Sequence, residues 1–273
     1  MTHSENEPPK KDASAPAAFH AWLWSLHLLA AVILGLSFFP MVLLFHTVWH
    51  SLAGQPAWVK ALGLSFSIGF GYFLFGTTLI FLCVGAQKLF GFRIRPGLNP
   101  FYSHASYQWM AYNSLILIAN SAFLDVLRIS PFQTLFYRLM GAKIGSGVNV
   151  NTGGLADLSM LEIGDGVIIG GGVALICHSA ERGLLRLEAT KIGNRVSIGL
   201  GSVVMPGCEI GEGASIAPCT YLPKGTKVPP RGVWGGNPAR DLRAERRAAL
   251  ALQEPPVPES GAATGDTALA EEG

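Results

Sequence analysis

The sequence predicts a mainly β chain in which two transmembrane helices and an amphipathic helical segment precede a parallel β-solenoid. Three observations support this fold class. Aliphatic residues recur every six positions across residues 192–228. Two runs without a charged side chain, residues 21–45 and 61–84, come earlier in the chain. Charged residues make up only 14% of the chain, against about 25% in soluble domains, which places part of it in lipid.

The six-residue period excludes an amphipathic helix for the second half of the chain. It is carried by the column Ile192, Ile198, Val204, Ile210, Ile216, Leu222 and Val228. A helix needs apolar residues about every 3.6 positions, so a strict six drifts around its surface. In extended chain, positions i and i+4 share a face, and the i+4 residues are small or β-branched: Val196, Ser202, Cys208, Ala214, Thr220 and Thr226. A rung this narrow cannot bury its face alone, so rungs must stack.

The run IGNRVSIGLGSVVMPGCEIGEGASIAPC, residues 192–219, resembles the hexapeptide-repeat family. The resemblance implies a left-handed parallel β-helix, and most enzymes of that family are acyltransferases that use acetyl-CoA or another acyl-CoA. The left-handedness comes from the resemblance alone, because parallel crossovers are otherwise almost always right-handed.

The end of the repeat carries a second point of resemblance. The stretch GNPAR, residues 236–240, is similar to the G-x-P-A-[KR] closing signature of acyl-CoA-dependent members. There it shapes the end of the groove for the CoA arm, and Arg240 is placed to meet a CoA phosphate. The resemblance implies acyl-CoA, acetyl-CoA first, as co-substrate and no permanently bound cofactor. The expected co-substrate-binding residues are Gly199, Gly201, Gly236, Asn237, Pro238, Ala239 and Arg240. Capping the open solenoid end is the alternative role for this stretch.

Composition shifts divide the chain into six parts. In order they are a disordered arm (1–18), a transmembrane helical hairpin (19–88), an interfacial helical linker (89–142), the β-helix domain (143–240), a short basic helix (241–253) and a disordered tail (254–273). The arm and the tail are polar and rich in proline or acidic residues, a composition typical of disorder.

The two uncharged runs are each long enough to span a bilayer core of about 30 Å. The first lacks the short apolar core and the cleavage site of a signal peptide, so we expect a retained anchor. Small residues four apart in the second run allow close helix packing: Ser65 with Gly69, and Ser67 with Gly71. Lys60 is the one basic residue between the spans, with Lys and Arg on both outer sides. By the positive-inside rule, both termini and the solenoid are therefore cytoplasmic.

The linker is expected to contain a loop and two helices. Residues 96–107 are expected to form the loop, and residues 109–128 an amphipathic helix lying on the membrane, because polar residues interrupt them. Ser130 and Gln133 have capping-box spacing around Pro131, which predicts a helix at residues 131–140. We expect Gln133, Arg138 and Lys143 to face solvent or lipid headgroups.

His178 is the candidate catalytic residue. It is the only histidine after His104, and it stands where the repeat breaks before an extruded loop at residues 179–191; such breaks mark the binding face of a repeat protein. A neutral imidazole can take a proton from an attacking hydroxyl or amine as general base. A loop histidine has that role in hexapeptide acyltransferases, so the resemblance implies it here. A surface loop histidine is the alternative.

A general base needs a partner that fixes its tautomer. The candidate partners are Asp157, Glu181 and Glu188, among which the sequence does not choose, and Arg182 is a further possible contact for substrate. In the first span, His27 is a functional candidate because histidines are rare inside membranes.

These features together predict a membrane-anchored acyltransferase that moves an acyl group from acyl-CoA to a hydroxyl or amine. The family resemblance implies a homotrimer, and anchoring favours a lipid-linked or amphiphilic acceptor. One alternative is an amide-forming module that uses carrier-bound thioesters, because the stretches DLSMLEIGDG and HSAERG and the overall arrangement resemble the membrane-bound terminal domains of poly-amino-acid synthetases. Another alternative is a non-catalytic trimeric assembly module.

Other classes of function are disfavoured by composition. The net charge of +2 and the lack of a basic aromatic patch argue against nucleic acid. The carbonic-anhydrase branch of the resembled family binds metal through three histidines, and the solenoid has one, so no metal site is expected. The four cysteines show no metal or disulfide spacing, which indicates reduced thiols in the cytosol.

Overall fold

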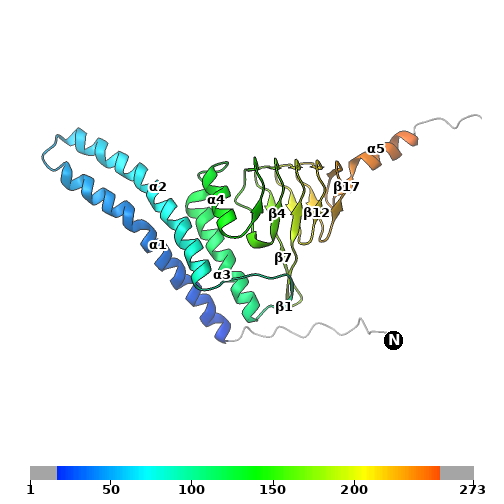
Figure 1. Ribbon diagram of the computed structural model, residues 1–273, viewed down its shortest axis with the longest axis horizontal. Coiled ribbons are helices and arrows are strands. Elements are labelled where there is room, and N and C mark those ends of the chain that lie inside the picture. Colours follow the sequence, from blue (N-terminus) through cyan, green and yellow to red (C-terminus); the bar gives the residue numbers. More distant parts are fainter. Residues whose placement is uncertain (1–16, 253–273) are drawn as a thin grey trace, which may run out of the picture.

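The computed structural model describes residues 17–252, so the whole predicted tail and all of the predicted arm except residues 17 and 18 lie outside the described residues. Both uncharged runs form long helices, α1 (Ala17–Ser51) and α2 (Ala57–Leu89). They pair as an antiparallel hairpin that projects away from the rest of the molecule (Figure 1). Ala17 and Ala18, predicted to belong to the arm, are already helical.

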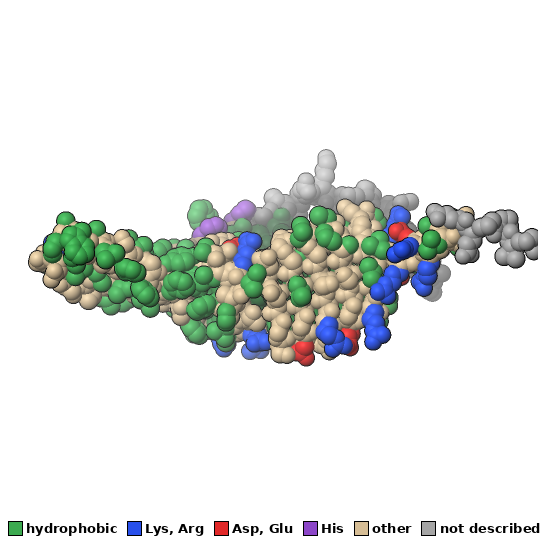
Figure 2. All heavy atoms as spheres, turned by 90° about the horizontal axis from the view of Figure 1, so that it is seen from above, with side chains coloured by type: hydrophobic (Ala, Val, Ile, Leu, Met, Phe, Trp, Pro, Cys, Tyr) green, Lys and Arg blue, Asp and Glu red, His purple; other side chains and the backbone are tan. Residues whose placement is uncertain are grey.

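The hairpin is apolar on its outside. Both helices are long and apolar enough to cross a membrane by length and composition. On the face shown in Figure 2, the distal part of the hairpin carries no Lys, Arg, Asp or Glu side chain. Of the two predicted small-residue pairs, Ser67 and Gly71 are buried, and a Cβ on Gly71 would lie 2.7 Å from Met41 Cγ of α1. Ser65 and Gly69 are exposed and make no close helix contact within residues 17–252.

The linker differs from the predicted loop and surface helix. It contains β1 (Gly97–Pro100), α3 (His104–Ala119), a π-helical turn η1 (Asn120–Leu124) and α4 (Pro131–Leu139). Tyr112, Leu115 and Ile116 of α3 are buried, because α3 packs between the hairpin and the solenoid and does not lie freely on a membrane (Figure 1). Asn113 and Asn120, two of the polar residues that interrupt this segment, donate hydrogen bonds to Asp157 and Gly153 of the solenoid.

The predicted helix at α4 is present, and Arg138 and Lys143 are exposed as predicted, but the predicted capping box is absent. The Ser130 side chain forms no cap. Gln133 is buried, so it does not face solvent; its Nε2 donates to the Thr152 carbonyl at 2.8 Å, and its Oε1 makes no capping bond. Arg138 donates to the carbonyls of Ile144 and Gly145, which ties α4 to the first coil.

The solenoid stacks short parallel strands into three sheets. Their orders are β17-β16-β13-β10-β5-β3, β14-β11-β6 and β15-β12-β9-β4-β2, with only the β16–β17 pair antiparallel. The bounds are β2 (Lys143–Ile144), β3 (Asn149–Val150), β4 (Leu161–Ile163), β5 (Ile168–Ile169), β6 (Ala174–Leu175), β9 (Thr190–Ile192), β10 (Ser197–Ile198), β11 (Val203–Val204), β12 (Glu209–Ile210), β13 (Ser215–Ile216), β14 (Tyr221–Leu222), β15 (Lys227–Val228), β16 (Val233–Gly235) and β17 (Arg240–Asp241).

The register explains the six-residue period. Ile192 pairs with Ile210, and Ile210 with Val228, so one coil takes three hexapeptides and each sheet receives every third member of the column. The whole aliphatic column is buried, as are the i+4 residues from Val196 to Thr220. The predicted parallel solenoid is confirmed, and its left-handed sense stays a prediction. Beyond it, Asp241 caps the basic helix α5 (Leu242–Ala251), accepting from the backbone N–H of Arg243 and Ala244.

The predicted extruded loop is an ordered hairpin. It comprises β7 (His178–Glu181) and β8 (Leu184–Leu187), and β1 pairs with β8 on its free edge. Arg182 and Gly183 both have positive φ, of 50° and 74°, as expected for a two-residue hairpin turn. A short antiparallel sheet therefore links the segment after α2 to the strand that begins with His178.

Candidate active site

The candidate site centres on an Asp–His pair at the edge of the solenoid. His178 Nδ1 lies 2.6 Å from Asp157 Oδ2. The Asp157 side chain is fully buried, whereas 25% of the His178 side chain is exposed. Asp157 immediately precedes the 3-10 turn η2 (Leu158–Met160), and His178 begins β7, so both stand where the regular coils are interrupted. Of the three candidate carboxylates, Asp157 is the one that meets His178.

Asp157 is held by donors from two parts of the chain. Its Oδ1 accepts from Trp109 Nε1 and from Asn113 Nδ2, both at 2.8 Å, and both donors come from α3. Its Oδ2 accepts from the backbone N–H of Cys177 at 2.9 Å. In return, the Asp157 backbone N–H donates to Asn113 Oδ1 at 2.9 Å. A buried carboxylate is costly unless its lone pairs are satisfied, and these bonds satisfy them.

The contacts of Asp157 select the tautomer of His178. A carboxylate is acceptor-only, so it takes the proton of Nδ1–H and leaves Nε2 as the lone-pair nitrogen. Nε2 makes no hydrogen bond within residues 17–252. The indole of Trp109 packs against the imidazole, with ring centroids 4.7 Å apart and planes at 61°. The ring is thus fixed by a bond on one side and by an aromatic contact on the other.

Tyr112 supports the turn that follows Asp157. Its hydroxyl donates to the Met140 carbonyl at 2.6 Å and accepts from the Ser159 backbone N–H at 3.0 Å. Burial raises the pKa of Tyr112 to about 12, so the hydroxyl stays protonated and acts as a structural bridge. Cys177, next to His178, is also buried, and burial raises the pKa of its thiol to about 12. Because the thiolate is the nucleophilic form, Cys177 is unsuited to covalent catalysis.

A cavity of about 700 Å³ opens at His178. One wall is α1, a second is α3, and a third is the first irregular loop of the solenoid, residues 153–156. The wall residues are mostly apolar: Leu23, Leu26, His27, Ala30, Trp109, Met110, Asn113, Ser114, Ile116, Leu117, Ile118, Asn120, Gly153, Gly154, Leu155, Ala156 and His178. The candidate base therefore faces a space that is shared between the solenoid and the first apolar helix.

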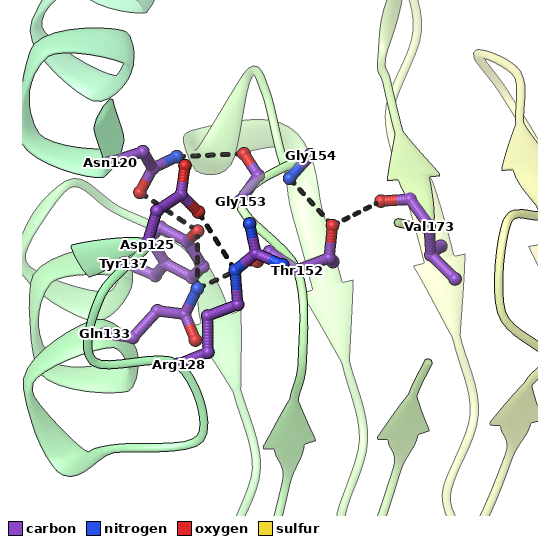
Figure 3. Close-up of polar contacts among 9 residues, drawn as sticks. All are labelled: Asn120, Asp125, Arg128, Gln133, Tyr137, Thr152, Gly153, Gly154 and Val173. Atoms are coloured by element: carbon purple, nitrogen blue, oxygen red, sulfur yellow. Dashed lines mark hydrogen bonds and ion pairs between the residues drawn. The ribbon is translucent and has the colours of Figure 1, made fainter. Parts of the chain in front are cut away.

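A second polar cluster, drawn in Figure 3, fixes the loop wall of this cavity. Asn120 Nδ2 donates to the Gly153 carbonyl at 3.0 Å, and the Tyr137 hydroxyl donates to Asn120 Oδ1 at 3.2 Å. Thr152 Oγ1 accepts from the Gly154 backbone N–H at 3.0 Å and donates to the Val173 carbonyl at 2.9 Å. These bonds connect η1 and α4 to the first coils of the solenoid and hold residues 153–154 in place.

The other predicted site residues lie elsewhere or have structural roles. Glu181 pairs with Lys224, and Glu188 with Arg186 at 2.9 Å, so neither orients His178. Arg182 is exposed in the hairpin turn.

The predicted co-substrate residues occupy tight places in the backbone. A Cβ on Gly199 would clash with the backbone of Pro218 in the next coil, and Gly201 has a φ of +68°. The closing stretch folds back on the last coil and bonds to Tyr221; it comprises Gly236, Asn237, Pro238, Ala239 and Arg240. The Tyr221 backbone N–H donates to the Gly236 carbonyl, and the Tyr221 carbonyl accepts from the Ala239 N–H. Arg240 is exposed, 3.7 Å from Glu245. End capping is thus one role of this stretch.

Sequence reasoning missed Trp109 and Asn113 as parts of the site. The signal in the sequence is the polar content of residues 109–128, which fits a helix on a membrane surface equally well. Among residues 17–252, no group of three or more His, Cys, Asp or Glu side chains is arranged to hold a metal ion.

Residues 189–224 match the family model described as bacterial transferase hexapeptide (six repeats). The predicted hexapeptide-repeat resemblance is therefore confirmed for this part of the chain. Among the relatives, the Delta-poly-L-ornithine synthetase of Acinetobacter baumannii (strain AB307-0294) is 25% identical over 174 residues, which cover 63% of this chain and only 12% of that protein. The protein YvoF of Bacillus subtilis (strain 168), named provisionally as an acetyltransferase, is 27% identical over 148 residues, covering 50% of this chain and 85% of that protein.

Among the solved structures is a hexapeptide-repeat acetyltransferase of Vibrio cholerae O1 biovar eltor in complex with acetyl coenzyme A. It is 22% identical, covers 52% of this chain and 91% of that chain, and gives a TM-score of 0.41.

Proposed function

We propose that this chain, which carries bacterial-transferase hexapeptide repeats at residues 189–224, is a membrane-anchored acyltransferase. It transfers an acyl group, in the first instance acetyl, from acyl-CoA to a hydroxyl or amine of an acceptor. The observation that carries the proposal is the buried Asp157 bonded to His178 Nδ1 at 2.6 Å, with Nε2 left without a protein partner within residues 17–252. An imidazole held in this way is suited to general-base catalysis.

The reaction proceeds in two steps around Nε2 of His178. Nε2 removes the proton of the acceptor hydroxyl or amine as the acceptor attacks the thioester carbonyl carbon. The new C–O or C–N bond gives a tetrahedral oxyanion, which backbone N–H groups of the coil stabilise. The C–S bond then breaks, and the imidazolium passes its proton to the leaving CoA thiolate, which departs as the thiol. Asp157 stabilises that imidazolium and keeps the ring oriented.

The donor is expected to lie along the solenoid, with its CoA arm ending at the closing stretch. There Arg240 is exposed and available to pair with a phosphate. By resemblance to the family, three copies of the chain form a homotrimer, and CoA binds between the solenoids of two neighbouring copies. No cofactor remains bound between turnovers.

Membrane anchoring is supported by the surface of α1. Its exposed side chains include large hydrophobics along most of its length, among them Trp24, Leu28, Val32, Leu36, Phe39 and Leu43. In water such a face costs about 25 cal/mol for each Å² of apolar surface, whereas in lipid it costs nothing. This surface supports insertion of the hairpin in the bilayer, and the distribution of Lys and Arg supports a cytoplasmic position for the solenoid and both chain ends.

A second candidate function follows from the match to the poly-ornithine synthetase. That match extends beyond the repeats to 63% of this chain. In this alternative the donor is an aminoacyl thioester on a carrier protein, and the same His178 activates the attacking amine. The two candidates share the base and differ in the donor.

Titration calorimetry with CoA on the detergent-solubilised protein separates them. The acyl-CoA proposal predicts saturable CoA binding that weakens about tenfold or more in Arg240→Glu, because one charge-assisted phosphate contact contributes about 1.5–3 kcal/mol. Arg247→Glu, on exposed α5, is the matched control and keeps wild-type affinity. Absence of CoA binding, together with turnover of a carrier-bound thioester, would establish the second candidate. Absence of both activities would leave an assembly module.

A further inference from the structure

The first apolar helix, α1, forms part of the cavity at His178. An acyltransferase that acts on a water-soluble acceptor would not need such a wall. Leu23, Leu26 and Ala30 of α1 form one wall, facing α3 and the loop at residues 153–156. Figure 1 shows α1 and α3 side by side next to the solenoid. The space of about 700 Å³ is within the range of ligand pockets, about 300–1,000 Å³. An acetyl group alone would leave most of it empty.

The polar side chains of the walls are already paired with the protein. Asn113 exchanges two hydrogen bonds with Asp157. Asn120 is bonded to Gly153 and Tyr137. Ser114 Oγ donates to the Met110 carbonyl at 2.8 Å. The polar wall groups are thus engaged within the protein, and most of the remaining wall is aliphatic, a surface that favours an apolar chain over a sugar or a peptide backbone.

Two ring nitrogens interrupt this apolar surface. One is Nε2 of His178, and the other belongs to His27, whose Nδ1 lies 2.8 Å from the Leu23 carbonyl. Neither Nε2 atom has a hydrogen-bond partner in the part of the chain that the structure describes. The cavity thus combines a long apolar wall with polar atoms that a hydroxyl or amine can reach. This combination is complementary to an amphiphilic ligand.

Building on the proposed function, we propose that this cavity binds the hydrocarbon chain of an amphiphilic acceptor. The reacting hydroxyl or amine lies at His178 Nε2, and the chain runs along Leu26, Ala30 and Leu117. The acceptor is preferred over a long donor acyl chain as the occupant because α1, placed in the bilayer, offers a membrane-dissolved molecule direct access. CoA thioesters are water-soluble and approach along the solenoid.

Chain-length dependence tests the proposal in nanodiscs, with acetyl-CoA as donor and butylamine, octylamine and dodecylamine as acceptors. In the wild type, KM for the amine is expected to fall about fourfold for each methylene that enters the cavity. Ala30→Phe fills the space, so it is expected to abolish this dependence and to raise KM for dodecylamine at least tenfold. Thermal unfolding of Ala30→Phe close to that of the wild type shows that the variant is folded.

The matched control is Ala31→Phe, which adds the same ring to the adjacent, exposed position of α1. It is expected to keep the wild-type chain-length dependence. Leu117→Trp reduces the cavity from the side of α3 and repeats the effect of Ala30→Phe. Equal dependence in Ala30→Phe, Ala31→Phe and wild type would overturn the proposal. A change in the preference for octanoyl-CoA over acetyl-CoA, with the amine series unaltered, would also overturn it, by assigning the cavity to the donor.

Photo-crosslinking separates this proposal from the proposed function. Dodecylamine with a diazirine at the chain end is expected to label residues 23–30 of α1 and 110–118 of α3. Labelling decreases in Ala30→Phe and persists in Ala31→Phe and in His178→Ala, because it needs no turnover. If these segments are labelled but the wild type forms no amide, the acyltransferase proposal fails alone. If the wild type forms amide but these segments are unlabelled, the cavity proposal fails alone.

Discussion

His178→Ala is expected to lower kcat for acyl transfer from acetyl-CoA by about 10²–10⁴, the range that a positioned general base contributes. The side chain is partly exposed, and within residues 17–252 its one hydrogen bond is to Asp157, so the fold should persist. The measurement is the rate of thiol release from acetyl-CoA in the presence of octylamine, corrected for the rate without enzyme.

The control for this variant is His104→Ala. His104 is an exposed histidine at the start of α3 that contacts Gln108, and its removal is expected to leave kcat within about twofold of wild type. If His178→Ala also kept full turnover, with CoA affinity intact, His178 would not be the base.

Asp157→Asn is expected to approach the loss seen in His178→Ala, since an Asp→Asn change behind a catalytic histidine costs up to about 10⁴ in kcat. The amide oxygen still accepts from Trp109 Nε1 and Asn113 Nδ2. Its NH₂ group, however, faces His178 Nδ1 and the Cys177 backbone N–H. The imidazole must then turn its lone pair to Nδ1 and carry its proton on Nε2, where it cannot act as a base.

This substitution also carries a cost in stability. The Cys177 N–H loses its acceptor inside the protein, and an unsatisfied buried donor costs about 1–3 kcal/mol of unfolding free energy. Thiol release and thermal unfolding of the same preparation measure both effects. Glu188→Gln, at a carboxylate that pairs with Arg186 and makes no hydrogen bond to His178 in residues 17–252, should change neither by more than about twofold in rate or 0.5 kcal/mol in stability. Losses in Glu188→Gln as large as those in Asp157→Asn would show that Asp157 is not the specific orienting partner of His178.

The solenoid was predictable because its signal is local and repeated. Each rung contributes one aliphatic and one small inward residue, and Ile192, Ile210 and Val228 of the predicted column pair directly in the structure. The place where the repeat fails also pointed to His178. The choice of Asp157 among the carboxylates was not predictable. Asp157 lies in an irregular segment between two coils, and the six-residue period does not determine the backbone path there.

The parts that sequence reasoning missed depend on long-range contacts. Trp109 and Asn113 reach Asp157 across 48 and 44 residues, and nothing near them in the chain indicates that partner. Likewise, Gln133 has the spacing of a capping box, but a bond to the Thr152 carbonyl 19 residues away takes its side chain. In α2, Ser65 and Ser67 are equally spaced from a glycine, and only the position of α1 decides which pair is buried.

The central claim is that Asp157 and His178 act as one catalytic unit, and a double-mutant cycle on kcat tests it most directly. The rates of wild type, His178→Ala, Asp157→Asn and the double variant are measured under identical donor and acceptor concentrations. If Asp157 acts only through the imidazole, the double variant is as slow as His178→Ala, within about twofold, because residues that act as a unit are not additive. If the two losses multiply in the double variant, the two side chains act independently and the claim is contradicted.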